Sequence, residues 1–229
     1  MPNLSLRLKT IADMIPFGAK ICDIGTDHGY LPIFLKKEGK VQSVIATDVN
    51  IKPLKRAENN ISAQNISGIE LRLCDGLEGI KFGEVDTVII AGMGGEVISG
   101  ILEKGNVIVN DPNITLVMQP TTSPEILREY LQKNGFKFLE EIPVFENQKT
   151  YSVMKCRFDG EIGDNNETFN YIGLIKPDSD EGKAYIEKQK LRCFKCMKSL
   201  EKIPKKQQEY LHYKRVYEEI MRMVKDYGV

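Results

Sequence analysis

The sequence predicts an α/β protein with a doubly wound, mostly parallel sheet, followed by a separate pair of helices. Apolar runs alternate with segments of helical periodicity over residues 20–134, the pattern of parallel strands joined by crossover helices. Two strand-like runs follow without a helix between them, and two long helical patterns end the chain. A length of 229 residues is enough for one sizeable core and a smaller appendage.

The chain opens with a helix. Apolar residues recur at helical spacing from Leu4 to Ile15, and Pro16-Phe17-Gly18 ends the pattern. The spacing of apolar residues then predicts strands at 20–24, 43–48, 69–73, 85–91 and 114–118, and helices at 29–38, 52–65, 95–104 and 123–134.

The last two strands are expected to form a hairpin. Residues 136–143 and 150–158 both have strand-like composition, and the short polar segment 145–149 joins them. So short a connection fits an antiparallel pair that closes one edge of a parallel sheet.

The C-terminal part differs from the rest. Residues 159–170 are polar and contain glycine, as in a linker, which divides the chain into domains 1–160 and 161–229. Beyond the linker, apolar residues recur in steps of three and four on either side of Pro204. These two seams predict an antiparallel, coiled-coil-like helical hairpin. Their members are Ile186, Gln189, Cys193, Cys196, Leu200 and Ile203, and then Tyr210, Tyr213, Tyr217, Ile220, Val224 and Tyr227.

The first strand leads into a candidate cofactor site. It ends at Asp23-Ile24-Gly25-Thr26-Asp27-His28-Gly29, and the next strand ends in Asp48 about two dozen residues later. Strand, glycine turn, helix, strand and acid is the layout of a nucleotide-type cofactor site, in which the final acid accepts from ribose hydroxyls. A dinucleotide site normally needs a third glycine for its pyrophosphate. Here Asp27 would repel a pyrophosphate and suit an ammonium group, which favours S-adenosylmethionine over NAD.

Two later strand ends fit the same cofactor. Cys74-Asp75-Gly76 follows the third strand, where a carboxylate can read an adenine amino group. The fourth strand runs into Ala91-Gly92-Met93-Gly94-Gly95, whose glycines let the backbone approach a ligand closely. Each glycine alone is compatible with an ordinary tight turn. Together the four strand ends fall at one edge of the expected sheet and indicate a site.

At these residues the chain resembles the bacterial tRNA (adenine(22)-N1)-methyltransferases, a class I, S-adenosylmethionine-dependent family. The resemblance rests on the opening helix, on Asp23–Pro32, on Ala91–Gly95 and on Leu116–Pro120, and it covers nearly the whole chain. It implies a Rossmann-like class I sheet and methyl transfer to N1 of an adenine in tRNA. Many enzymes that methylate the exocyclic amine carry an Asn/Asp-Pro-Pro-Tyr/Phe turn after the fourth strand. Ala91–Gly95 replaces that turn here.

The expected site residues follow from these motifs. Asp27, with Glu96 behind it, is the candidate carboxylate for the adenine 6-amino group, and Tyr30 is the candidate stacking surface for an extracted base. Asp27 could instead cap the following helix or contact the cofactor amino group, and Tyr30 could pack under the turn. Gln119-Pro120 could border the base pocket or only end its strand. The expected cofactor contacts are Asp23, Gly25, Thr26, Asp27, His28, Gly29, Asp48, Val49, Asp75, Gly76, Gly92 and Met93.

The charge distribution suggests a polyanionic partner. The formal net charge is zero, yet from Lys183 to Arg215 eleven basic residues face three acids, a net charge of +8. We expect this arm to bind tRNA phosphates; a solvated helical hairpin that dimerises is the alternative. The candidate RNA contacts are Lys188, Arg192, Lys195, Lys198, Lys202, Lys205, Lys206, Lys214 and Arg215.

Composition bounds the remaining possibilities. No run of about 20 apolar residues exists, so we expect no membrane span. Five cysteines, an odd number without framework spacing, are typical of reduced thiols in the cytoplasm, and Cys193-x-x-Cys196 alone does not indicate a metal. We expect a monomer or weak homodimer. The alternative functions are an NAD-dependent oxidoreductase, a small-molecule methyltransferase and a non-catalytic RNA-binding module.

Overall fold

The computed structural model describes residues 4–164 and 166–227. Within them, seven strands form one sheet in the order β3-β2-β1-β4-β5-β7-β6. The five strands β1 to β5 are parallel, and β7 runs antiparallel to both β5 and β6, which confirms the expected edge hairpin. The strands are β1 (Ala19–Ile24), β2 (Val41–Asp48), β3 (Ile69–Leu73), β4 (Thr87–Gly94), β5 (Thr115–Thr122), β6 (Phe136–Glu146) and β7 (Lys149–Phe158).

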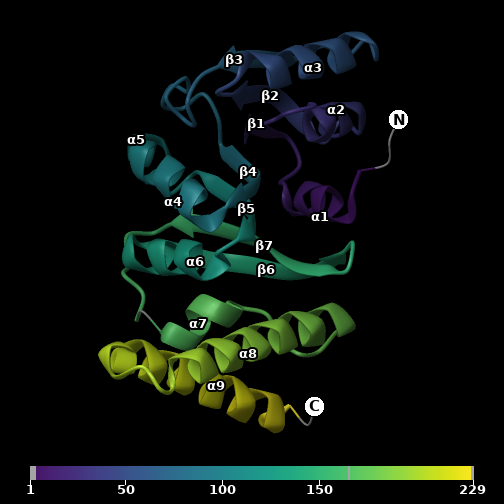
Figure 1. The fold of residues 1–229 in the computed structure, drawn as a ribbon. Helices are drawn as coiled ribbons and strands as arrows, with labels where there is room; N and C mark the ends of the chain where they lie inside the picture. Colours follow the sequence, from purple (N-terminus) through teal and green to yellow (C-terminus); the bar gives the residue numbers. More distant parts are fainter. Residues whose placement is uncertain (1–3, 165, 228–229) are drawn as a thin grey trace.

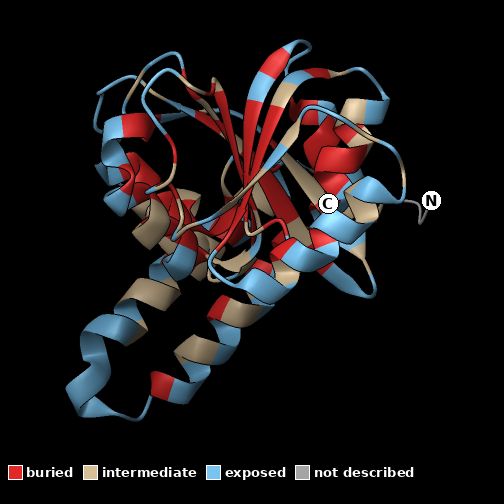
Figure 2. Cartoon of the chain, turned by 90° about the horizontal axis from the view of Figure 1, so that it is seen from above, coloured by how far each residue is buried: buried red, intermediate tan, exposed pale blue. Residues whose placement is uncertain are grey.

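Helices cover both faces of this sheet (Figure 1). One apolar core lies between the sheet and the helices α4, α5 and α6. A second core lies on the other face, under α1 and α2, and α3 packs beside α2 against β2 and β3. Figure 2 shows the buried residues concentrated along the strands. These helices are α1 (Leu6–Met14), α2 (Tyr30–Lys37), α3 (Ile51–Ser62), α4 (Gly95–Lys104), α5 (Asn106–Val109) and α6 (Pro124–Lys133).

The sequence predicts most elements within a few residues, with two differences, the first of which affects the site. The fourth strand was expected to end at residue 91, yet β4 continues to Gly94 with an irregularity at Gly92, where the pairing with β5 skips one residue. The short helix α5 was not anticipated, because four residues contain too little periodicity to be recognised.

Three helices form the C-terminal appendage: α7 (Glu167–Ile172), α8 (Asp180–Leu200) and α9 (Gln207–Asp226), with a 3-10 turn η1 (Pro204–Lys206) before α9. The two long helices lie antiparallel, as expected, and their connection projects away from the sheet (Figures 1 and 2). The expected linker 159–170 was wrong in part. Its last residues begin α7, which starts where the Asn166 side chain accepts from the Phe169 N–H, and Tyr171 and Ile172 enter the core of the hairpin.

A buried arginine joins the appendage to the sheet. Arg128 on α6 has no exposed surface and donates to Glu141 Oε1 on β6 at 2.6 Å. The same guanidinium donates to the Tyr185 hydroxyl on α8 at 2.7 Å and to the backbone carbonyls of Asn170 and Tyr171 on α7. Because these partners are all buried, the hydrogen-bond network holds the appendage in one orientation on the sheet.

Candidate active site

The carboxyl ends of β1, β2, β3 and β4 meet at one cavity of about 440 Å³, here called the strand-end cavity. Parallel strands bring their carboxyl ends to one edge, which is where ligands bind in open α/β sheets. The cavity is lined at these ends by Gly25, Asp48, Asp75 and Gly92, and α4 forms its far wall. The prediction that these four strand ends lie together agrees with this geometry.

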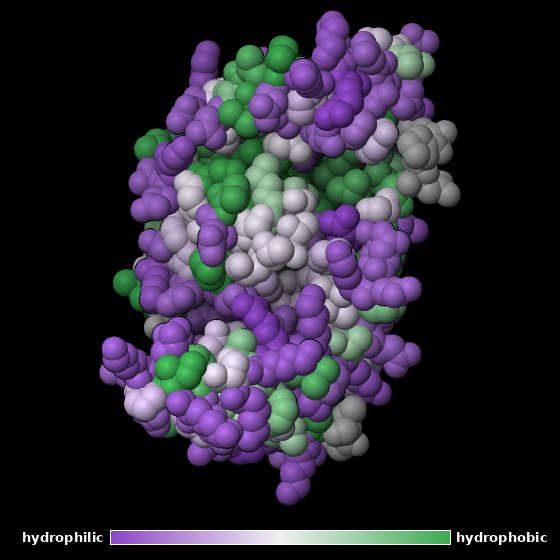
Figure 3. All heavy atoms as spheres, in the orientation of Figure 1, coloured by the Kyte–Doolittle hydropathy of each residue, from purple (hydrophilic) through white to green (hydrophobic). Residues whose placement is uncertain are grey.

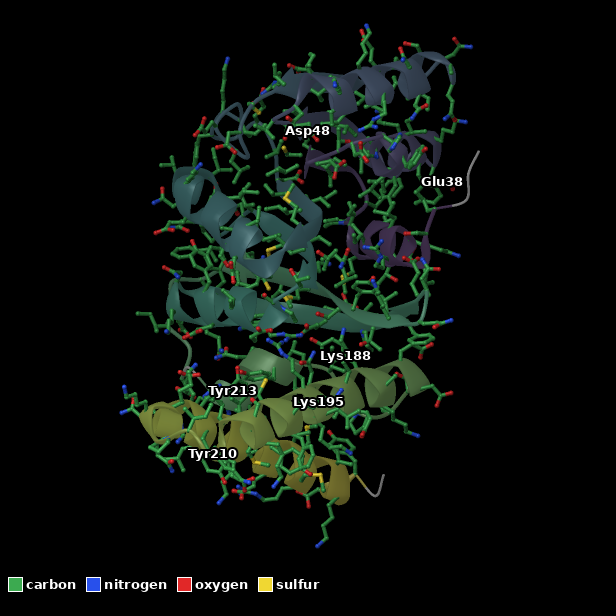
Figure 4. The ribbon with its side chains drawn as sticks, viewed as in Figure 1. Glu38, Asp48, Lys188, Lys195, Tyr210 and Tyr213 are labelled. Atoms are coloured by element: carbon green, nitrogen blue, oxygen red, sulfur yellow. The ribbon has the colours of Figure 1, made fainter. Side chains whose placement is uncertain are left out.

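Two carboxylates of the strand-end cavity differ in their surroundings. Asp48 is 9% exposed, and its Oδ1 accepts from the Asn50 N–H at 2.8 Å, which orients the carboxylate at the end of β2 (Figure 4). Asp75 lies across the cavity, and its Oδ2 accepts from Lys104 Nζ on α4 at 2.8 Å. Lys104 was not among the expected site residues, because it lies 29 positions from Asp75 in the chain.

A second cavity of about 270 Å³, the α1–α2 cavity, adjoins the first and shares Gly25, Ala91 and Gly92 with it. Asp23 lines this cavity with 5% of its surface exposed, and within the described residues no cation pairs with its carboxylate. Burial therefore raises the pKa of Asp23 to about 6, and the Thr26 hydroxyl opposes that shift only in part. The site thus contains a buried carboxylate suited to a cationic ligand.

Glycine is required where the two cavities meet. Gly25 has φ +75°, and a Cβ there would overlap the Met93 methyl group. Gly92 has φ +80° and stands at the irregularity of β4, with open space where a Cβ would be. Both backbones occupy the left-handed region that other residues rarely adopt. A ligand spanning the two cavities can therefore approach the main chain closely at these positions.

Asp27, His28 and Tyr30 all line the α1–α2 cavity. The His28 and Tyr30 rings are stacked, with centroids 5.1 Å apart and planes 6° from parallel. Asp27 has φ 44°, and its Oδ1 accepts from Arg56 Nη2 on α3 at 2.9 Å. It does not cap α2, whose N-cap is Gly29 and has no side-chain hydrogen bond.

Helix α1 supplies a wall of this cavity that the sequence did not indicate. Arg7 lines it and donates from Nη1 to Gln119 Oε1 at 2.9 Å and from Nε to Glu146 at 2.7 Å. Gln119 lines the same cavity, which fits the idea that the end of β5 borders the base pocket. Glu96, expected behind Asp27, lines neither cavity and is exposed on the first turn of α4.

The structure divides the nine candidate RNA contacts. Two of them bond to the sheet domain. Arg192 forms a two-bond pair with Glu125 on α6, at 2.6 and 2.7 Å. Lys188 donates to the Thr150 carbonyl at 2.8 Å, between the sheet and α8 (Figure 4). Arg215 pairs with Glu167 on α7. Arg192 is therefore half-buried against the sheet domain, whereas Lys188 and Arg215 remain exposed, and the expectation that these residues bind RNA stays a prediction.

The other six lysines are distributed over the outer surface of the hairpin, which is largely hydrophilic in Figure 3. Three make exposed pairs with glutamates three or four residues away, which contribute little energy: Lys198, Lys206 and Lys214. Lys195, Lys202 and Lys205 have no ion pair with any described residue. Figure 3 also shows apolar residues gathered along a hollow of the main body, at the level of β1 and β4.

Neither a metal-binding cluster nor a membrane-spanning helix is present in the described part of the chain. No group of three or more His, Cys, Asp or Glu side chains is arranged to hold a metal ion. No helix is long and apolar enough to cross a membrane. The five cysteines are free thiols, and burial raises the pKa of Cys193 to about 12, so that this thiol stays protonated.

The sheet order and the acidic and glycine-bearing strand ends define a Rossmann-like methyltransferase. Comparison with known proteins agrees: residues 4–154 match the methyltransferase-domain family. A Bacillus subtilis tRNA (adenine(22)-N(1))-methyltransferase is 36% identical over 173 residues, which are 75% of this chain and 71% of the relative. The chain belongs to the family of that enzyme.

Solved structures extend the likeness over the appendage. A Streptococcus pneumoniae protein in complex with S-adenosyl-L-methionine has a TM-score of 0.80 at 30% identity, covering 93% of this chain and 99% of its own. Mycoplasma capricolum TrmK in complex with S-adenosyl-homocysteine has a TM-score of 0.79 at 28% identity, covering 97% and 98%. These alignments include nearly all of the C-terminal helices as well as the sheet.

Proposed function

We propose that this protein transfers a methyl group from S-adenosylmethionine to N1 of an adenosine in tRNA, adenosine 22 by its likeness to the B. subtilis relative. The observation that carries the proposal is the pair of adjoining cavities: the strand-end cavity suits a nucleoside, and the α1–α2 cavity has room for the amino-acid tail beside Asp23 and for a base. Since tRNA is the proposed substrate, we place the activity in the cytoplasm.

The residues of the strand-end cavity fit the proposed cofactor. Asp48 keeps one carboxylate oxygen available for a ribose hydroxyl, as the acid after the second strand does in such sheets. Thr47 Oγ1 is buried there without a hydrogen-bond partner among the described residues, and a bound ligand can supply one. Asp75 and Val49 line the same cavity and would border the adenine.

The amino-acid tail would extend past Gly25 toward Asp23. A buried carboxylate without a cation is costly when ionised, and a ligand ammonium lowers that cost. A dinucleotide fits this site less well, because the turn after β1 lacks the third glycine and contains Asp27, whose charge would repel a pyrophosphate. S-adenosylmethionine, when bound, supplies the methyl group on its sulfonium.

The protein must then hold the adenine in line for attack. The N1 lone pair of neutral adenine is nucleophilic without a base, so alignment and stabilisation of the charge that develops on the ring supply most of the catalysis. The stacked His28–Tyr30 pair offers a flat aromatic surface to a base in the α1–α2 cavity. Asp27 at its mouth is the proposed carboxylate for the 6-amino group and would exchange part of its pairing with Arg56 for that contact.

The outer lysines of the hairpin are the proposed tRNA contacts away from the active site. Lys195 lies on α8, and Lys202 and Lys205 lie in the connection between α8 and α9. None of the three has an ion pair with a described residue, and such uncompensated charge binds phosphates in a salt-dependent way. A small-molecule methyltransferase would have no use for this arm.

The test is methyl transfer to unmodified tRNA transcripts by the purified protein, with the product nucleotide mapped by mass spectrometry of nuclease fragments. We expect 1-methyladenosine at position 22 and none in a transcript with guanosine at that position. Methylation at another atom or another position would contradict the assignment. Cofactor binding without any transfer to tRNA would favour a non-catalytic RNA-binding module.

A further inference from the structure

A groove beside the active site has no part in the function described so far. It lies between α8 and two segments of the sheet domain, residues 120–124 from the end of β5 to the start of α6 and residues 150–152 at the start of β7, and has a volume of about 360 Å³. We call it the α8 groove.

Two buried polar atoms of the α8 groove lack partners. Gln189 is 2% exposed, and its Oε1 has no hydrogen bond to any described residue; Thr150 is 7% exposed, and its Oγ1 is in the same state. Buried polar groups are nearly always paired in native proteins, because an unpaired one loses its hydration without compensation. Two such atoms beside one groove leave hydrogen-bonding capacity that a bound polar group could use.

The charge of the groove is positive. Lys188 and Arg192 line it, and none of its lining residues is an acid. Glu125 compensates Arg192, whereas Lys188 donates only to the neutral Thr150 carbonyl. Partial burial lowers the pKa of Lys188, and the nearby Arg192 and Lys149 charges lower it further. An anion bound beside Lys188 would relieve both effects.

The α8 groove begins where the proposed base pocket ends. Gln119 lines the α1–α2 cavity, and the next residue, Pro120, lines the α8 groove. The Tyr151 ring lies between the two: the Arg7 guanidinium is 4.7 Å from its centroid, and Lys188 Nζ is 6.0 Å from it. Basic side chains beside an aromatic ring are typical of surfaces that bind single-stranded nucleic acid.

We propose that the α8 groove binds the ribose-phosphate unit of a nucleotide next to the target adenosine. Lys188 contacts its phosphate, and Gln189 and Thr150 pair with hydroxyl or amide groups of its sugar and base. The proposal rests on the proposed function, because it takes the α1–α2 cavity as the pocket of the target base. It gives α8 a role in positioning the substrate strand at the active site, separate from the outer lysines of the hairpin.

The test uses Gln189→Leu, Thr150→Val and Lys188→Met in the full-length protein, with tRNA methylation, cofactor calorimetry and thermal unfolding measured for each. We expect kcat/KM for tRNA to fall roughly fivefold to tenfold in each variant, mainly through KM, with cofactor affinity unchanged. In Lys188→Met, the slope of log affinity for tRNA against log salt should decrease by about 0.7, as for one lost phosphate contact on a single strand. Lys183→Met, on the same helix but outside the groove, is the matched control and should behave as the wild type.

Stability separates this role from a structural one. Gln189→Leu removes an unpaired buried amide, so its Tm should stay constant or rise. Wild-type kinetics and salt slope in all three variants would overturn the proposal, as would a loss of Tm in Gln189→Leu with tRNA kinetics intact. If the wild-type protein methylates no tRNA, both the proposed function and the proposed role of the α8 groove are contradicted. If the wild-type protein is active and the three variants are unaffected, only the proposed role of the groove is contradicted.

Discussion

Replacing Asp23 by Asn should stabilise the free protein and weaken its binding of the cofactor. Burial raises the pKa of Asp23 from 3.8 to about 6 in the folded state, so the folded protein binds this proton more tightly than the unfolded chain. Below about pH 4 the free energy of unfolding is therefore not reduced by Asp23. It falls as the pH rises through 6, because the buried carboxylate ionises, and it stays lowered at higher pH. A shift of about two units corresponds to about 3 kcal/mol, the upper limit of the stabilisation by Asp23→Asn at neutral pH.

Cofactor binding should depend on pH in the opposite direction. If the ligand ammonium binds only the ionised carboxylate, a group with a pKa of about 6 weakens the apparent Kd about tenfold between pH 7 and pH 5. Asp23→Asn should bind weakly at both pH values. S-adenosylhomocysteine is the suitable probe, since it has the same ammonium group and cannot react.

The assays are calorimetric titration at pH 5, 6 and 7 and thermal unfolding without ligand over the same range. At neutral pH we expect Asp23→Asn to raise Tm by several degrees, at about 2–4 °C per kcal/mol for a chain of this length. Asp13→Asn, an exposed carboxylate on α1, should change neither measurement. The reasoning is refuted if wild-type affinity is equal at pH 5 and pH 7, or if Asp23→Asn binds the ligand normally.

Three further changes test other parts of the structure. Asp27→Asn introduces a residue that tolerates a φ of 44°. It should lower kcat for tRNA about tenfold, while the cofactor Kd measured by calorimetry stays within about twofold. A change in the cofactor Kd alone would assign Asp27 to cofactor binding. Reversing Lys195, Lys202 and Lys205 to Glu should weaken tRNA binding in filter assays at moderate salt without affecting the cofactor; unchanged binding together with a changed oligomeric state would favour dimerisation. Arg128→Met leaves Glu141 buried and unpaired and should cost about 3–5 kcal/mol in denaturant unfolding. Adding Glu141→Leu should recover much of that loss, and a double variant no more stable than the single one would contradict the ion-pair explanation.

The strand ends could be predicted because their chemistry is local in the chain. Asp48 follows an apolar strand directly, and Gly25 and Gly92 follow theirs, so topology alone brings the three to one cavity. Arg7 and Lys104 could not be found in this way. Their side chains reach the cavities only through the packing of α1 and α4, which no spacing in the sequence encodes.

The C-terminal arm shows a different limit. The seams predicted two antiparallel helices, since periodicity over 20 or more residues is a strong signal. Helix α7 has six residues and no repeat, so it was taken for part of a linker. Charge counting also treated Lys188 and Arg192 as surface cations, although both face the sheet domain. Which side chains of a helix face the rest of the protein can be decided only once the surface that the helix packs against is known.

The buried Arg128 junction fixes the distance between the active site and the far end of α8, and this distance would restrict which RNAs can be substrates. Because α8 is anchored through Tyr185 and Arg192, its far end cannot swing relative to the active site. Leu200 is twelve positions after Lys188, which corresponds to roughly 18 Å at the rise of an α-helix. If the outer lysines of the hairpin bind tRNA as proposed, an RNA would have to present its adenine and a more remote stretch of backbone at one set separation. A hairpin fragment with the same loop but a shortened stem would enter the pocket and still be a poor substrate, because it would not reach the end of the arm.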